Sequence, residues 1–259
     1  MKRAIWLLAA AAWGQGVEFI GLEETTQKWA EERLDRLPDG RIHYCAADLK
    51  KAGYADASVV IHIGNDRKMF TVVTVVEAKR AGEVQRRAQP SEEIAVPAQW
   101  TVEAAIEVLS RSKNTANRTS AAKALRNFAD REETWRALAA ALRDPEDRVA
   151  GEATSALQWI RMHAVRSVDW APVADDLAAI LHGSNLFGFN ELVRTLKDTS
   201  VDPSMAKALL GNGGARILLA CLAARHDDER NSAHALLVQL RGTDLGPSPE
   251  PWQAWLSTL

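Results

Sequence analysis

The stretch from Asp144 to Ile160 reads DPEDRVAGEATSALQWI, and it predicts the second of two paired helices. It opens with Asp-Pro, because proline is tolerated in the first turn of a helix and aspartate can cap the free amides there. A small residue, Ala153, is followed three positions later by the apolar pair Ala156-Leu157, and Ile160 follows after three more. This spacing puts all four side chains on one helical face. We expect that face to be buried.

The same pattern recurs between residue 99 and the C-terminus, and an amphipathic stretch precedes each copy. A helix pair cannot bury its own apolar face alone, and stacking successive pairs in a line buries it. The region 99–259 is therefore expected to be mainly α, an α–α superhelix of about four helix pairs. The copies are Ala121/Ala124-Leu125/Phe128, Ala153/Ala156-Leu157/Ile160, the degenerate Phe189/Leu192-Val193/Leu196, and Ala233/Leu236-Leu237/Leu240, preceded by amphipathic stretches at 102–109, 134–142, 173–181 and 215–224.

Two segments carry a resemblance to a known family. Residues 144–149, with Ala153 and Ala156-Leu157 after them, closely resemble the second helix of a HEAT repeat of the phycobilisome-lyase type. The tail RGTDLG at 241–246, followed by Trp252-Gln253-Ala254-Trp255-Leu256, resembles the closing segment of many exported bacterial HEAT proteins, in which a Trp-x-x-Trp helix caps the last repeat. The resemblance implies a HEAT-like superhelix, a fold that serves many functions. This chain departs from the pattern at Phe187 and Phe189 and at an insertion over 202–214.

Residues 18–95 predict a separate, small α+β domain. The clearest strands are 58–63 and 69–77, which are rich in Val, Ile and Thr and are separated by turn residues at 64–67, so they predict an antiparallel hairpin. Val72, Thr74 and Val76 share one side of the second strand, and Val73 and Val75 share the other. A hairpin alone is marginally stable, so we expect a third strand and a helix over one face.

Around the hairpin, the pattern predicts shorter elements. The apolar stripe over 22–37 predicts a helix that stops at Pro38-Asp39-Gly40. Residues 41–45 alternate and suggest a short strand, and 46–52 suggest a helical turn that ends at Gly53. Residues 89–98, with two prolines and several acidic residues, predict a linker to the helical region.

The N-terminus has the pattern of a secretory signal peptide. Lys2 and Arg3 precede an apolar run from Ile5 to Trp13, and small residues at Ala12 and Gly14 suit cleavage after Gly14. Residues 1–14 are therefore expected to be removed, and the mature protein to be periplasmic or secreted. The alternative is an N-terminal helix that remains attached, or an uncleaved anchor. No other stretch reaches membrane-spanning length, so no membrane insertion is expected after cleavage.

Composition and charge give no sign of a nucleic-acid partner. The 259 residues carry a formal net charge of −2, which becomes −4 when Lys2 and Arg3 are removed, and the pI is about 6.3. Nothing global in this balance attracts polyanions. Nine tryptophans, against two tyrosines, suggest packing between helices. Cys45 and Cys221 lie far apart and are expected to be buried thiols rather than a disulfide.

A search for catalytic and ligand-binding motifs finds no specific one. The six histidines form no i, i+4 pair with a carboxylate. His43 and Cys45 lie two positions apart on one face of the expected strand, but a tetrahedral metal site needs three or four ligands. The loop Gly211-Asn212-Gly213-Gly214 lacks the lysine of a phosphate loop and reads as a turn. We therefore expect no metal, no cofactor and no enzymatic activity.

Two surface features suggest contact with another molecule. Lys79, Arg80, Arg86 and Arg87 follow the hairpin and read as a docking patch or, more simply, as a solvated mixed-charge segment. The second helices of a HEAT superhelix line its concave face, which is a common binding surface. Its polar positions are Lys123, Arg126, Gln158, Asn190, Glu191 and Arg194. The alternative is an ordinary solvated face.

Two functions remain open at this point. The first is an exported, non-enzymatic scaffold that binds a protein or peptide of unknown identity through its repeat surface. The second is an enzyme or enzyme accessory, lyase-like only by the name of the repeat family, with a site in the N-terminal domain or in a cleft between the domains. Its weak candidates are His43, Cys45 and His62, which would have to converge in one pocket.

Overall fold

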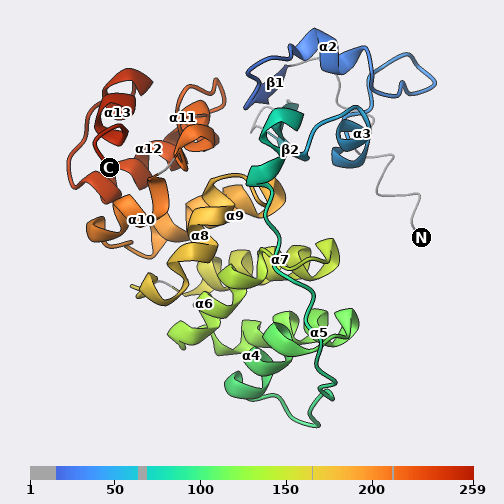
Figure 1. Cartoon of the computed structure of the whole chain (residues 1–259), viewed down its shortest axis with the longest axis vertical. Helices are drawn as coiled ribbons and strands as arrows, with labels where there is room; N and C mark the ends of the chain where they lie inside the picture. Colours follow the sequence, from blue (N-terminus) through green and yellow to red (C-terminus); the bar gives the residue numbers. More distant parts are fainter. Residues whose placement is uncertain (1–15, 64–68, 165, 212) are drawn as a thin grey trace.

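The chain is mainly helical, with a small three-stranded mixed sheet at its N-terminal end (Figure 1). The structure is a computed structural model and describes residues 16–63, 69–164, 166–211 and 213–259. The predicted signal peptide, 1–14, and the predicted hairpin turn, 64–67, lie outside these ranges. Within them, no helix combines the length and the apolar character that crossing a membrane requires.

The sheet contains the predicted hairpin and a third strand. Strands β2 (Asp56–Ile63) and β3 (Met69–Val76) pair antiparallel, and β1 (Val17–Ile20) adds to the other edge of β3 in parallel, giving the order β1-β3-β2. The hairpin prediction is confirmed, and so is the need for a third strand. The third strand lies at residues 17–20, where the sequence pattern predicts no strand.

The two faces of β3 are buried against different partners, as its alternation predicts. Val73 and Val75 pack with Leu49 and other apolar side chains of the N-terminal segments, including α2 (Gln27–Glu31) and α3 (Ala46–Lys51). Val72 and Val76 belong instead to the apolar core of the helical region. The sheet is therefore a layer between two short helices and the long helical part of the chain.

The predicted helix over 22–37 is wrong in its extent, because α2 covers only Gln27–Glu31. The backbone amides of Glu23, Glu24 and Thr25 donate to the buried carboxylate of Glu77, which holds them in a loop. The predicted strand over 41–45 is also wrong, since this part of the chain forms one isolated bridge, Arg36 to Ile42. The turn at 38–40 and the short helix before Gly53 are confirmed.

The helical region consists of two rows of neighbouring helices. Helices α4, α6, α8 and α10 pack in sequence in one row, and α5, α7, α9 and α12 pack in sequence in the other. The four predicted apolar patterns fall in the second row and are buried, apart from the half-buried Phe128. The bounds are α4 (Val102–Arg111), α5 (Thr115–Leu125), α6 (Glu132–Ala141), α7 (Asp147–His163), α8 (Ala174–Leu181), α9 (Leu186–Asp198), α10 (Ala206–Leu210), α11 (Arg216–Leu222), α12 (Asp227–Arg241) and α13 (Pro249–Leu256).

The inserted segment and the tail close this arrangement at its C-terminal end. The insertion supplies α10, which packs on α8, while α11 packs on α12, α13 and β1. The Trp-x-x-Trp sequence lies in α13, where Trp252 is fully buried and its indole N–H donates to the Gly246 carbonyl at 2.7 Å. Trp135 and Trp170 are also fully buried. These three tryptophans fill space between elements, as the sequence predicts.

Asp144 does not cap α7 as the sequence suggested. The N-cap is Glu146, which makes no side-chain cap, and the Asp144 carboxylate accepts the Glu146 amide at 2.9 Å. The same carboxylate binds the fully buried Arg118 of α5. The turn at Asp144-Pro145 therefore links α5 to the start of α7, its neighbour in the second row.

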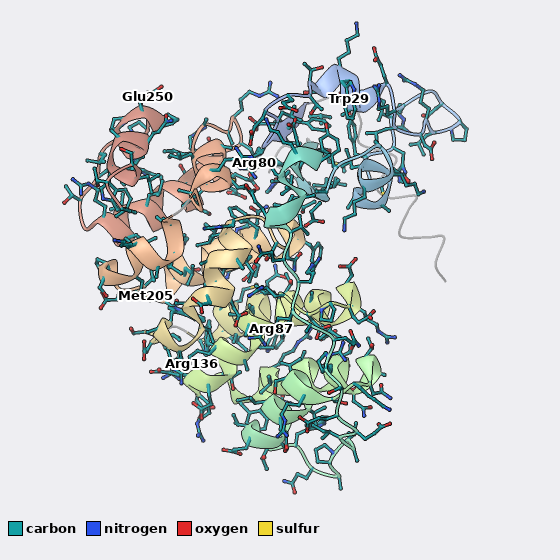
Figure 2. The ribbon with its side chains drawn as sticks, viewed as in Figure 1. Trp29, Arg80, Arg87, Arg136, Met205 and Glu250 are labelled. Atoms are coloured by element: carbon teal, nitrogen blue, oxygen red, sulfur yellow. The ribbon has the colours of Figure 1, made fainter. Side chains whose placement is uncertain are left out.

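The segment after the sheet runs along the helices down to α4 (Figure 1). The Arg87 backbone amide donates a hydrogen bond to the Arg143 carbonyl, and Glu92 forms an isolated parallel β-bridge with Ser112. Further along, the Ile94 carbonyl accepts a hydrogen bond from the Asn117 side chain. Arg87, which lies over the middle of the helical region, also pairs with the buried Asp176 (Figure 2). This part of the predicted linker and basic patch is therefore engaged with the helices of its own chain.

Candidate functional site

An open hollow lies where α5 and α7 run side by side. Its volume is about 470 Å³, and we call it the α5–α7 hollow. Lys123 is exposed at its rim, and Arg126 is half-buried with its guanidinium bonded to Glu152 at 2.7 Å. Both belong to the predicted binding face. The hollow is lined by Trp100, Ser120, Lys123, Ala124, Arg126, Asn127 and Trp159.

An exposed aromatic side chain forms one wall of this hollow. Trp159 is 50% exposed, although tryptophan is mostly buried in folded proteins, and its ring stacks on His163 with 4.1 Å between centroids. Met162, nearby on α7, is 68% exposed. Tryptophan, methionine and arginine are enriched in protein interfaces relative to the rest of the surface.

The other predicted face residues have different surroundings. Gln158 is exposed, while Asn190 and Arg194 are half-buried and line a narrow gap between α9 and α12. Glu191 is buried, and its carboxylate accepts from Arg161 of α7 at 2.7 Å and 3.2 Å. Glu191 therefore ties α7 to α9, and its predicted position on the solvent-facing surface is wrong.

A second hollow separates the sheet from the helices. This cleft has a volume of about 460 Å³ and a largely apolar lining that includes Ile61 of β2 and Phe187 of α9, both well exposed. Cys45 lines it at the start of α3. The charged pair Lys50 and Asp56, also in the lining, is joined by an ion pair of 2.9 Å. The cleft thus offers a thiol and apolar surface.

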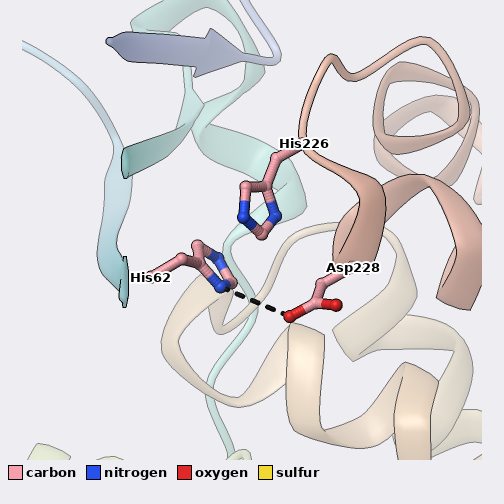
Figure 3. A group of neighbouring side chains, drawn as sticks. All are labelled: His62, His226 and Asp228. Carbon is pink, nitrogen blue, oxygen red and sulfur yellow. Dashed lines mark ion pairs between the residues drawn. The ribbon is translucent and has the colours of Figure 1, made fainter. Parts of the chain in front are cut away.

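A group of titratable side chains joins the sheet to α12. His62 comes from β2, and His226 and Asp228 come from the start of α12 (Figure 3). Glu229 follows Asp228 in α12. The buried Glu229 carboxylate contacts both rings, at 2.8 Å to His62 Nε2 and 2.7 Å to His226 Nδ1. The two rings lie face to face, 3.8 Å between centroids. We call these four residues the histidine cluster.

The surroundings of the histidine cluster hold its geometry. Phe70 of β3 stacks on His226 at 5.3 Å, and the Glu18 carboxylate of β1 accepts the backbone amides of Arg225 and His226. Burial alone would raise the pKa of Glu229, but the hydrogen bonds and charges of His62 and His226 outweigh it and lower that pKa. Burial, Glu229 and Glu18 raise the pKa of the Cys221 thiol, so this free cysteine is a structural thiol.

The three weak catalytic candidates have different neighbours. His62 binds Glu229 of α12, Cys45 lines the cleft, and His43 Nδ1 lies 3.2 Å from Asp48. Among the described residues, the lining of the cleft includes neither histidine. Within the described residues, the three side chains therefore do not line this cleft together, as a shared catalytic pocket would require.

Sequence reasoning missed the histidine cluster altogether. His62 and Glu229 are 167 positions apart, and residues 226–228 read simply as a turn before a helix. No local spacing signals such a site. Comparison with known proteins adds nothing to its interpretation, because no protein-family model and no curated protein matches this chain.

Proposed function

We propose that the chain is an exported, non-enzymatic interaction protein that binds a protein or peptide partner in the α5–α7 hollow. In this proposal, the helix pairs form a HEAT-like superhelix. The two rows of sequentially packed helices support it, as does the capping position of the Trp-x-x-Trp helix. Export is inferred from the signal-peptide pattern of residues 1–14.

The half-exposed Trp159 beside Lys123 and Arg126 is the observation that carries the proposal. The N-terminal sheet packs at the α9 and α12 end of the second row, so it leaves these residues accessible. A partner that presents an apolar side chain next to a carboxylate fits the hollow best. Its apolar group would cover Trp159, and its carboxylate would pair with Lys123.

A binding test follows from this arrangement. The mature protein is used to capture partners from the envelope fraction of its source, and the captured partner is then titrated against variants. Trp159→Ala and Lys123→Glu are each expected to weaken binding at least about tenfold, because tryptophan is among the residues that dominate interface energies and a glutamate at position 123 would repel the partner's carboxylate. Their unfolding transitions should shift little, since both side chains are largely solvent-facing.

Arg148→Glu is the matched control. Arg148 lies on the same helix as Trp159, in the first turn of α7, is exposed, and is not among the residues that line the hollow. Its charge reversal should leave affinity unchanged. If Arg148→Glu weakens binding as much as the two hollow variants do, the hollow is not the specific binding surface. If both hollow variants bind the partner normally, the partner binds elsewhere. Either result would contradict the proposal.

The enzymatic alternative rests on Cys45 in the cleft between the sheet and the helices. A nucleophilic cysteine needs a nearby base, and the charged lining residues Lys50 and Asp56 are already paired with each other. The open, aromatic hollow therefore supports binding better than the cleft supports catalysis.

A further inference from the structure

The contacts of Glu229 fix how the two histidines of the cluster carry their protons. An ionised carboxylate can only accept hydrogen bonds, so the ring nitrogens that face it, His62 Nε2 and His226 Nδ1, both donate. Neutral imidazoles in this arrangement keep their lone pairs on the opposite nitrogens, His62 Nδ1 and His226 Nε2. Glu229 thus orients both rings as carboxylates do behind metal-bound histidines.

The free nitrogen of His62 faces a second carboxylate. His62 Nδ1 lies 3.5 Å from Asp228 Oδ2, and a nitrogen lone pair and a carboxylate oxygen can both bind a cation placed between them. Two ligands of one tetrahedral zinc ion are about 3.4 Å apart, given metal–ligand bonds of about 2.0–2.1 Å. The distance between these two atoms therefore fits two ligands of a shared metal ion.

A third ligand completes the set. One ligand atom each from His62, His226 and Asp228 can be chosen so that all lie within 4.8 Å of one another. Figure 3 shows these side chains pointing toward one another from β2 and from the start of α12. Asp228 is the exposed member, with 64% of its side chain accessible, so a solvent-facing position remains for water.

We propose that His62, His226 and Asp228 bind a divalent transition-metal ion, with zinc as the best fit, and that Glu229 positions the two histidines. Imidazole ligands select this class of ion over magnesium or calcium, which prefer oxygen ligands. The ion links β2 to the start of α12 and thereby fastens the sheet to the helical region. This inference is independent of partner binding in the α5–α7 hollow.

The charged groups near the cluster are consistent with a cation. Arg225 pairs with Glu18 at 3.6 Å, and Arg230 pairs with Asp227, so these guanidiniums are directed to other carboxylates. Arg194 of α9 lines the gap that Asp228 and Glu229 also line. Asp228 itself has no other ion pair among the described residues than that with His62.

Metal-free mature protein, titrated with zinc by calorimetry, is expected to bind one ion per chain, and its thermal transition should rise with zinc. Cobalt should give the absorption of a low-symmetry bound ion, and magnesium should produce neither effect. Asp228→Asn is expected to weaken zinc binding at least about tenfold, and Glu229→Gln by about 10–100-fold through loss of ring positioning.

His234→Ala is the matched control, because His234 contacts Asp244 at 2.8 Å in another histidine–carboxylate pair that lies outside the cluster. It should bind zinc as the unaltered protein does. Since Asp228 is exposed, its asparagine variant should fold normally, which circular dichroism would verify. Zinc binding that is absent from the unaltered protein, or equal in Asp228→Asn, would overturn the proposal and would leave the contacts of His62 with Asp228 and Glu229 as ion pairs alone.

Discussion

Replacing Arg118 by alanine is expected to lower the free energy of unfolding by about 3–5 kcal/mol. The Arg118 side chain is fully buried, and its guanidinium donates to both Asp144 oxygens, at 2.8 Å and 2.9 Å, and to the Ser112 carbonyl at 2.8 Å. Without it, Asp144 keeps a buried negative charge that has lost its partner. A loss of this size is a large part of the stability of a typical domain.

Urea unfolding followed by circular dichroism measures this effect. Arg148→Ala serves as the control, since Arg148 is an exposed arginine close by in sequence, and surface substitutions usually change stability by less than about 0.5 kcal/mol. A second variant, Asp144→Asn, should also be destabilised, because it leaves the buried guanidinium without a counter-ion. A loss below about 1 kcal/mol for Arg118→Ala would contradict the assigned role of this pair.

Replacing Glu77 by glutamine should cost about 3 kcal/mol at neutral pH. Burial alone would raise the pKa of Glu77, but hydrogen bonds from the Thr25 hydroxyl at 2.6 Å and from three backbone amides outweigh it and lower that pKa to about 2. A glutamine amide would turn two N–H donors toward groups that also donate. The loop at 23–25 would then lose the anion that orders it.

The pH dependence has a definite sign. The folded-state pKa of Glu77 lies below its ordinary value of 4.5, so its contribution is fully present above pH 4.5 and is lost as pH falls toward 2. The stability difference between the unaltered protein and Glu77→Gln should therefore be largest near pH 7 and shrink below pH 4.5. Urea titrations at several pH values test this. Glu250→Gln, at an exposed site in α13, should show no such dependence, and a Glu77 difference that persists at low pH would be evidence against the charge argument.

Local periodicity was enough to predict the helices of this region, because each repeated apolar face packs on the helices next to it. The four patterns ending at Phe128, Ile160, Leu196 and Leu240 lie at contacts between successive helices. The alternation of Val72 to Val76 likewise predicted which side chains lie on each face of the sheet. In both cases the spacing of apolar residues along the chain decides burial.

Predictions failed where a distant polar partner decides the local structure. The stripe at 22–37 could form a helix, but Glu77 binds the amides that would begin it. Glu191 occupies a surface-like position in the pattern, yet Arg161 holds it inside. Asp144 reads as a helix cap, and only the fold brings Arg118 to it.

The histidine cluster shows the same limit for function. Its members are conspicuous only after β2 and α12 are brought together, and neither segment has metal-binding spacing by itself. By contrast, Lys123 and Arg126 could be assigned to one face from the repeat alone. Trp159, which lines the hollow they share, was missed because the pattern marks it only as a neighbour of the buried Ile160.

Site-specific photo-crosslinking tests the proposed binding role most directly. A photoreactive amino acid replaces Asn127, an exposed residue of the hollow lining, in one variant and Arg148 in another, and each is irradiated in the envelope of its source. We expect a discrete crosslinked partner from position 127, reduced by adding Trp159→Ala, and none from position 148. Absence of a crosslink at 127, or the same product from both positions, would contradict the claim that the α5–α7 hollow receives a partner.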